Sequence, residues 1–243
     1  RSVIALEKQA IDEIKHAIQD NPNDIAALII EPIQGEGGDN HFRAEFMKEL
    51  RTICDENDIM FIYDEVQTGI GLTGKMWAHE HFGDEALPDM ISFGKKTQVC
   101  GFFASKRIDE VKNNVFHESA RLNSTWGGNL IDMVRFSMFL EVIEQEKLVD
   151  KAAHSGKYLL NELNKLESDF PDVIFNSRGK GLFCAFDLNS GEKRDKLRGL
   201  IQGEGTIMLG CGPKTIRFRP PVNISTDEID IGIESIRRAI KRF

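Results

Sequence analysis

The sequence lacks the cysteine pairs typical of zinc sites, a long apolar run of the kind that spans a membrane, and the excess of basic residues typical of nucleic-acid binding. Its four cysteines are scattered over 243 residues without a C-x-x-C pair, which argues against zinc and disulfides and for a reducing, cytoplasmic setting. No apolar run approaches the ~18 residues that cross a bilayer. Acidic residues (39) outnumber basic ones (31), and the net charge is −8. We therefore expect neither a membrane nor nucleic acid as a partner.

Two short apolar runs each stop at charged residues, and these residues are the candidates for chemistry. Residues 60–63 stop at Asp64, and residues 90–93 stop at Gly94 and Lys95. Both runs predict buried strands of a parallel sheet. Because ligands of open α/β sheets collect beyond the carboxyl ends of the strands, we expect Asp64 and Lys95 to face one crevice.

A carboxylate beside a lysine suits pyridoxal 5'-phosphate, which carries a ring nitrogen at one end and an aldehyde at the other. Asp64 would keep the ring nitrogen protonated, and the Lys95 amine would form the imine (Schiff base) that a substrate amine displaces. The two residues alone leave a second interpretation open, because a plain ion pair at the end of a sheet uses the same residue types.

The surrounding stretches resemble the signature of class III pyridoxal phosphate aminotransferases, the ornithine and 4-aminobutyrate type. The class signature lies in DEVQTG at residues 64–69 and SFGKK at 92–96. Within the class, the likeness is greatest to the enzymes that transaminate the ε-amine of lysine. It rests on GEGGDNHFR at 35–43, GKKTQVCG at 94–101 and RLNSTWGGN at 121–129.

This resemblance implies a fold and a reaction. The fold class is α/β, the type I fold of pyridoxal phosphate-dependent transferases. Residues 1–146 form the C-terminal part of the large, mostly parallel cofactor domain, and residues 147–243 form a small α+β domain. The reaction moves the ε-amino group of L-lysine to 2-oxoglutarate and gives 2-aminoadipate 6-semialdehyde and L-glutamate. Ornithine and 4-aminobutyrate are the alternative amino donors.

The resemblance also assigns roles to residues near the cofactor. Val66 packs on a face of the ring, and Gln67 hydrogen-bonds the ring oxygen. Thr125, with Ser124 beside it, reaches the cofactor phosphate of the neighbouring subunit, which implies a homodimer with shared active sites. From the residues alone, these hydroxyls before a predicted helix at 130–146 indicate either an anion site or an ordinary helix cap.

Arg217 and Arg219 alternate with Phe218 in a predicted strand, so both point to one face. Solvated arginines at a sheet edge would give the same pattern. By resemblance, Arg217 holds the α-carboxylate of glutamate or 2-oxoglutarate, work that suits the planar guanidinium. Glu36 resembles a gate that pairs with Arg217 while the lysine amine reacts and swings away when 2-oxoglutarate binds.

Two other interpretations remain open. Residues 69–74 match the G-x-G-x-x-G pattern of nicotinamide-binding enzymes, although five residues separate it from the strand that should precede it. The chain also starts at Arg1 rather than Met and lacks the phosphate loop and ring-stacking residue of its relatives. It therefore resembles the second half of a longer enzyme, or a truncated product without catalysis. His79 and His81 cannot easily reach one ion from a helix, and we assign no metal.

The C-terminal hundred residues contain strand and helix signals. We expect strands at 173–175, 182–188, 207–209 and 215–218, with a turn at 178–181. We expect a helix at 194–202 and a last helix that opens with a capping box formed by Ser225 and Glu228.

Overall fold

The computed structural model describes residues 2–243, so the expectation drawn from Arg1 lies outside the described part. Contacts between residues divide the chain into two compact units. Unit 1 holds the described residues up to Pro32, together with Phe42–Gln67 and His79–Ser137. Unit 2 holds Ile33–His41, Thr68–Ala78 and Met138–Phe243. The domain boundary expected after residue 146 stays a prediction.

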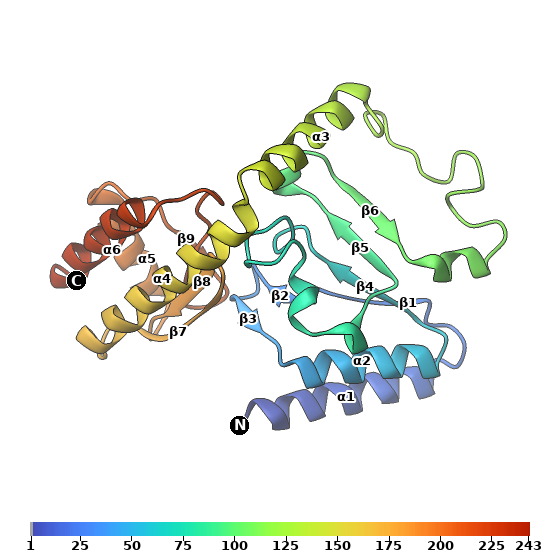
Figure 1. Ribbon diagram of the computed structural model, residues 1–243. Coiled ribbons are helices and arrows are strands. Elements are labelled where there is room, and N and C mark those ends of the chain that lie inside the picture. Colours follow the sequence, from blue (N-terminus) through green and yellow to red (C-terminus); the bar gives the residue numbers. More distant parts are fainter. Residues whose placement is uncertain (1) are drawn as a thin grey trace. The chain divides into compact units, whose positions relative to one another are not determined.

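Unit 1 is built on a four-stranded sheet with the order β1-β4-β5-β6 (Figure 1). Its strands are β1 (Ala27–Ile30), β4 (Met60–Asp64), β5 (Met90–Phe93) and β6 (Gly101–Ala104). The pairs β1–β4 and β4–β5 are parallel, and β5–β6 is antiparallel. The helices α1 (Val3–Asp20) and α2 (Ala44–Glu56) contact each other, and α2 packs against β4. The parallel arrangement predicted for the strands at 60–63 and 90–93 is confirmed.

The strands β4 and β5, expected to be buried, are only half-buried in the described structure. In β4, Phe61 and Tyr63 are fully buried, whereas Ile62 and Asp64 are partly exposed. Ile29 in β1 is 63% exposed. The alternation follows from the two-residue period of a strand, because α2 covers only one of the two faces that the side chains point to.

Unit 2 contains an antiparallel sheet with the order β7-β8-β10-β9, covered by three helices (Figure 1). The strands are β7 (Phe175–Lys180), β8 (Phe183–Asp187), β9 (Leu209–Cys211) and β10 (Thr215–Phe218). The helices are α4 (Leu148–Asp169), α5 (Gly191–Gly203) and α6 (Thr226–Lys241). The hairpin β2 (Ile33–Gln34) and β3 (Asn40–His41) belongs to this unit through Ile33, which lies in its core.

One continuous apolar core holds unit 2 together. It combines fully buried side chains of β8 and α4 with those of α6, among them Phe186, Leu163 and Ile236. The predicted capping box opens α6, since Ser225 accepts a hydrogen bond from the Glu228 amide and the Glu228 carboxylate accepts one from the Ser225 amide. Both ends of this motif satisfy amides that would otherwise lack partners.

Three predicted boundaries in unit 2 are wrong. The strand expected at 173–175 is β7, and it runs through the turn expected at 178–181. The chain turns instead at Gly181, whose φ is +53° and where a Cβ would lie 2.3 Å from the backbone carbon of Thr73. β9 begins at Leu209 rather than at residue 207, and α5 begins at Gly191 because Ser190 caps it. A glycine inside a strand and one at a true turn look alike in sequence.

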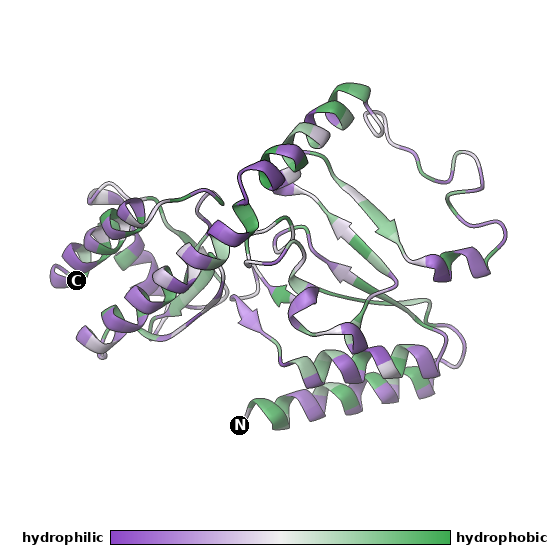
Figure 2. Cartoon of the chain, in the orientation of Figure 1, coloured by the Kyte–Doolittle hydropathy of each residue, from purple (hydrophilic) through white to green (hydrophobic). Residues whose placement is uncertain are grey.

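The helix α3 (Leu130–Gln145) has no buried residue in the described structure. Leu130, Ile131 and Val134 are 81%, 75% and 62% exposed. Figure 2 shows hydrophobic residues along this helix. None of the helices among residues 2–243 combines the length and the hydrophobicity that a membrane span requires.

Candidate active site

Asp64 is the last residue of β4 and pairs in register with Ser92 of the parallel strand β5. Its Oδ1 accepts a hydrogen bond from the Val66 amide (3.0 Å) and one from the Ser92 hydroxyl (3.3 Å). These two bonds orient the carboxylate, while Oδ2 has no hydrogen-bond partner within the described chain. The carboxylate is thus fixed on one side and available on the other. Ser92 was not singled out from the sequence, although its place opposite Asp64 follows from the parallel pairing.

Lys95 and Lys96 follow β5, and the structure separates their roles. Lys96 Nζ donates to the carbonyl of Gln67 at 2.5 Å, so this amine is engaged. Lys95 is exposed, and its amine makes no hydrogen bond or ion pair to any residue from 2 to 243. Its φ is +54°, in the left-handed region that few residues other than glycine adopt. Such local strain is typical of functional sites, and the available amine is that of Lys95.

Gly94 and Val66 lie against each other beside Lys95. A Cβ at Gly94 would lie 3.0 Å from the Cys100 sulfur and 3.6 Å from Cγ1 of Val66. This contact places the Val66 side chain next to the residue that precedes Lys95, on the loop that follows β4. The structure therefore brings the residues after β4 and after β5 to the same end of the sheet, as the parallel arrangement predicts.

A buried pair supports the turn after β4. Glu65 is 1% exposed, and its Oε1 accepts hydrogen bonds from the backbone amide of His79 at 2.8 Å and from Nδ1 at 3.0 Å. The His79 ring stacks on Tyr63, with ring centroids 5.8 Å apart. His79 is thus committed to Glu65. Among residues 2–243, no cluster of three or more metal-ligating side chains occurs.

Ser124 and Thr125 lie before α3 and are both exposed. The cap of α3 is Asn129, whose Oδ1 accepts a hydrogen bond from the Ile131 amide at 2.9 Å. The helix-cap interpretation of Ser124 and Thr125 is therefore wrong. Neither hydroxyl makes a hydrogen bond to another described residue, so both are available to a ligand.

Glu36 and Arg217 form an ion pair within unit 2. Arg217 Nη2 donates to Glu36 Oε2 at 2.7 Å. The Arg217 side chain is only 11% exposed, whereas that of Glu36 is 75% exposed. Arg217 Nε and Nη1 are buried and lack a hydrogen-bond partner among the described residues. A buried cation with two unsatisfied donors is suited to a carboxylate ligand.

A second network in unit 2 was not identified from the sequence. Asp39 is fully buried, and its Oδ2 accepts from Arg219 Nη1 at 2.9 Å. Burial raises the pKa of Asp39, while its hydrogen bond to Arg219 acts in the opposite direction. Arg178 donates from Nε to the carbonyl of Asp39 (2.9 Å) and from Nη2 to Asp187 (2.9 Å). These partners lie up to 180 residues apart, so no local pattern signals them.

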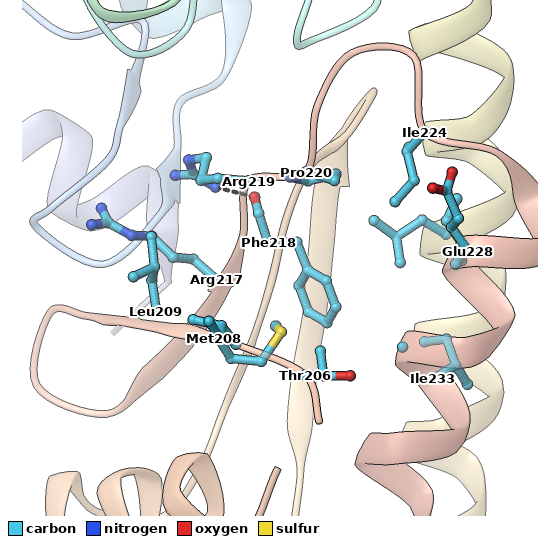
Figure 3. A pocket seen from close by; sticks show the side chains of 14 residues that line it. Thr206, Met208, Leu209, Arg217, Phe218, Arg219, Pro220, Ile224, Glu228 and Ile233 are labelled. Carbon is cyan, nitrogen blue, oxygen red and sulfur yellow. Dashed lines mark hydrogen bonds between the residues drawn. The ribbon is translucent and has the colours of Figure 1, made fainter. Parts of the chain in front are cut away.

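A cavity of about 340 Å³ in unit 2 lies beside β10 (Figure 3). The ring of Phe218 points into it among Met208, Ile224 and Ile233. The guanidinium groups of Arg217 and Arg219 point the other way, as the alternation of a strand requires. Arg217 and Arg219 thus contribute to the lining of this cavity, but their charged groups are directed away from Phe218.

The glycine pattern at 69–74 lacks the context of a nicotinamide site. A dinucleotide fingerprint turns directly from a strand into a helix. Here, residues 66–77 form turns and bends, followed by the short 3₁₀ helix Ala78–His81. The glycines thus serve a compact loop, and the nicotinamide interpretation is wrong.

Comparison with protein families agrees with this geometry. The family model for class III aminotransferases matches residues 3–240. The chain therefore belongs to the class III aminotransferases, and it has their fold.

Among curated relatives, an L-lysine-epsilon aminotransferase of Mycobacterium tuberculosis is 50% identical over 239 residues, 98% of this chain and 53% of the relative. The mitochondrial 4-aminobutyrate aminotransferase of Homo sapiens is 38% identical over 217 residues, 88% of this chain and 42% of the relative. A solved structure of lysine aminotransferase from M. tuberculosis matches with a TM-score of 0.95 and 50% identity, covering 98% of this chain and 55% of that one. The chain spans about half the length of these relatives.

Proposed function

We propose that the protein carrying this chain is an L-lysine 6-transaminase. It would move the ε-amino group of L-lysine to 2-oxoglutarate and give 2-aminoadipate 6-semialdehyde and L-glutamate. The observation that carries this proposal is Arg217, a buried cation with two unsatisfied donors and an exposed glutamate on its third nitrogen. The identity of 50% to a lysine-epsilon aminotransferase, against 38% to a 4-aminobutyrate aminotransferase, supports lysine as the amino donor.

The residues of unit 1 fit pyridoxal 5'-phosphate. The free Oδ2 of Asp64 suits a protonated ring nitrogen, and the unpaired Lys95 amine suits an aldehyde. Val66 would pack on the ring, Gln67 would hydrogen-bond the ring oxygen, and Ser124 and Thr125 would bind the phosphate. When bound, the cofactor supplies the aldehyde that joins amines and the ring that withdraws electrons from the substrate carbon.

The chain's own residues then divide the work. Asp64 holds the proton on the ring nitrogen, because a carboxylate next to a cation favours the charged form. Lys95 would act as the general base that takes a proton from the substrate carbon and as the general acid that delivers it to the aldehyde-derived carbon of the cofactor. Arg217 binds the carboxylate of 2-oxoglutarate through two parallel hydrogen bonds.

Glu36 makes one site serve two substrates of different charge. The ε-amine of lysine has no carboxylate near it, and an uncovered buried cation would then be costly. Glu36 supplies the missing charge during this half of the reaction. In the second half, the carboxylate of 2-oxoglutarate replaces Glu36, whose exposed side chain has room to leave.

The experiment that tests the proposal is a visible absorption scan of the complete protein with added pyridoxal phosphate, before and after lysine. We expect a band that requires Lys95, disappears in Lys95→Ala and bleaches on addition of lysine. Lys96→Ala is the matched control and keeps the band, because Lys96 is engaged with Gln67. If ornithine or 4-aminobutyrate bleaches the band at lower concentrations than lysine does, that amine is the preferred donor and lysine is not. The absence of any band would contradict the whole proposal.

The homodimer belongs to the same proposal, because Thr125 is assigned to the phosphate of the neighbouring subunit. Mixing Lys95→Ala and Thr125→Ala subunits under conditions of exchange tests this assignment. If sites are shared, mixed dimers contain one intact site, and statistics give about a quarter of the wild-type activity. If Thr125 serves its own subunit, mixing restores nothing. A cytoplasmic location is also proposed, and the four free cysteines support it.

A further inference from the structure

The backbone that carries Glu36 is held at every residue of its loop, although the Glu36 side chain itself is 75% exposed. The carbonyl groups of five consecutive residues accept hydrogen bonds. The Gly35 carbonyl accepts from the amides of Gly38 and Asp39 (both 3.2 Å), and the Glu36 carbonyl accepts from the Gly212 amide (2.8 Å). The Gly37 carbonyl accepts from Asn40 Nδ2 (3.3 Å). Arg178 donates to the carbonyls of Gly38 (2.7 Å) and Asp39 (2.9 Å). A loop with all its carbonyls occupied has little freedom to move as a unit.

Asp39 is the anchor of this arrangement. Its buried carboxylate accepts from both terminal nitrogens of Arg219, and the guanidinium of Arg219 lies over the ring of Phe183 in β8. Removing one partner of a buried pair leaves an uncompensated charge, so the pair holds the loop firmly. Arg178 adds a second attachment, because its Nη2 also pairs with Asp187 at the end of β8.

The loop of residues 35–39 packs closely against the turn after β9. Gly212 has a φ of +50°, and a Cβ there would lie 2.7 Å from Gly38 Cα and 2.8 Å from the Gly37 carbonyl oxygen. Two backbones that approach this closely can hydrogen-bond directly, as the Gly212 amide and the Glu36 carbonyl do. The site is therefore closed against backbone displacement on this side as well.

We propose that Asp39 is a positioning residue that fixes the backbone of residues 35–39, so that Glu36 covers and uncovers Arg217 by rotation of its own side chain. This inference rests on the proposed function, in which Glu36 gives way to a carboxylate. Asp39 touches neither substrate nor cofactor in this account. It sets the point from which the Glu36 side chain swings, and so keeps the closed position reproducible.

The first test follows amide hydrogen exchange in the complete protein loaded with pyridoxal phosphate, in peptides that cover residues 35–40 and 210–213. The amides of Gly38, Asp39 and Gly212 are hydrogen-bonded, and we expect their exchange to stay the same when 2-oxoglutarate is added. Faster exchange on binding would mean that the loop opens as a unit, which overturns the proposal. In Asp39→Asn, we expect these amides to exchange at least about tenfold faster.

Glu204→Gln is the matched control for this variant. Glu204 also accepts from arginines in unit 2, Arg238 at 2.8 Å and Arg242 at 2.5 Å, but makes no hydrogen bond to the loop. We expect it to leave exchange at residues 35–40 unchanged. If Asp39→Asn does not fold, Arg219→Lys replaces it, because lysine keeps the charge and loses the two-point fork. Unchanged exchange in the folded variant overturns the proposal.

The second test is a double-mutant cycle on 2-oxoglutarate binding, measured by calorimetry on the loaded protein. Asp39→Asn loosens the placement of Glu36, and we expect 2-oxoglutarate to bind at least about threefold more tightly. In the background of Glu36→Gln, the same substitution should change the affinity by less than about twofold. Equal changes in both backgrounds would indicate general distortion around Arg217, and no change in either would detach Asp39 from Glu36. Both results overturn the proposal.

Failure of the proposed function gives a different result. If Arg217→Lys leaves 2-oxoglutarate binding unchanged, Arg217 is not the carboxylate site and the cycle loses its meaning. The exchange measurement on Asp39→Asn still decides whether Asp39 anchors the loop.

Discussion

Unit 1 and unit 2 hold their proposed functional side chains in different ways. In unit 1, Asp64 is oriented by two hydrogen bonds on one oxygen, and the amine of Lys95 has no partner in the described chain. In unit 2, Arg217 lies on β10, which pairs with β8 and β9, and the loop of Glu36 is held by Asp39 and Arg178. The first arrangement leaves atoms available to a cofactor, and the second fixes the position of a charge.

The packing of the two units differs in the same sense. A continuous core spans the sheet and helices of unit 2, whereas Ile29 in unit 1 and Leu130 in α3 remain 63% and 81% exposed. Unit 1 has buried side chains of its own, among them Phe61 and Tyr63 of β4, but it also keeps these exposed apolar ones. Substitutions in the core of unit 2 should therefore affect folding, whereas those at exposed positions of α3 should matter little to it.

The largest effect is expected at Asp64. Asp64→Asn removes the charge that keeps the cofactor ring nitrogen protonated, and kcat/KM should fall roughly 10³-fold, about 4 kcal/mol. Unfolding by urea should change little, since Asp64 is partly exposed. The control Ser92→Ala removes one 3.3 Å hydrogen bond to Asp64 and should cost about tenfold or less. A loss of stability equal to the loss of activity would break the contrast between the units.

Phe186→Ala tests the core of unit 2. Phe186 is fully buried in β8, and the cavity left by its ring should lower the free energy of unfolding by about 3–4 kcal/mol. The control Val134→Ala lies on α3, where the side chain is 62% exposed, and should change it by about 0.5 kcal/mol or less. Urea titration of the complete protein measures both. Comparable losses would show that α3 is covered in the assembled protein.

Glu36→Ala sharpens the comparison within the reaction. The variant leaves Arg217 uncovered while the lysine amine reacts, so the half-reaction with lysine should slow by about tenfold or more. The half-reaction with glutamate, in which a carboxylate covers Arg217, should slow less. Single-turnover absorption measurements with each substrate separate the two. Equal losses in both would show that Glu36 is not a gate.

The smallest effect concerns thiol reactivity, which should distinguish the three buried cysteines from the exposed one. Burial raises the pKa of Cys54 to about 11 and those of Cys184 and Cys211 to about 12. Cys100 in unit 1 is exposed. At pH 8, an aromatic disulfide reagent should modify one thiol quickly, and three should react only on unfolding. Fast modification of Cys184 or Cys211 would show that the core of unit 2 opens readily.

The sequence allowed the positions of Asp64 and Lys95 to be predicted because each ends an apolar run, and parallel strands bring their carboxyl ends together. It also distinguished Arg217 by its place in a strand and by resemblance. The anchor at Asp39 could not be predicted. Its partner Arg219 lies 180 positions away, and a glycine-rich loop with a carboxylate looks like a solvated turn. The predicted boundaries of β7 were wrong because glycine occurs both inside the strand and at the turn that ends it.

Because Lys96 donates to the Gln67 carbonyl, Lys95 is the amine that we expect to carry the cofactor, and a peptide map can tell the two adjacent lysines apart. Trypsin cleaves after an unmodified lysine and fails after one whose amine carries a bulky group. If borohydride fixes the cofactor on the protein, digestion should skip the bond after Lys95 and cut the bond after Lys96. The peptide that carries the cofactor then ends at Lys96. If the cofactor were attached to Lys96 instead, that peptide would begin at Lys96.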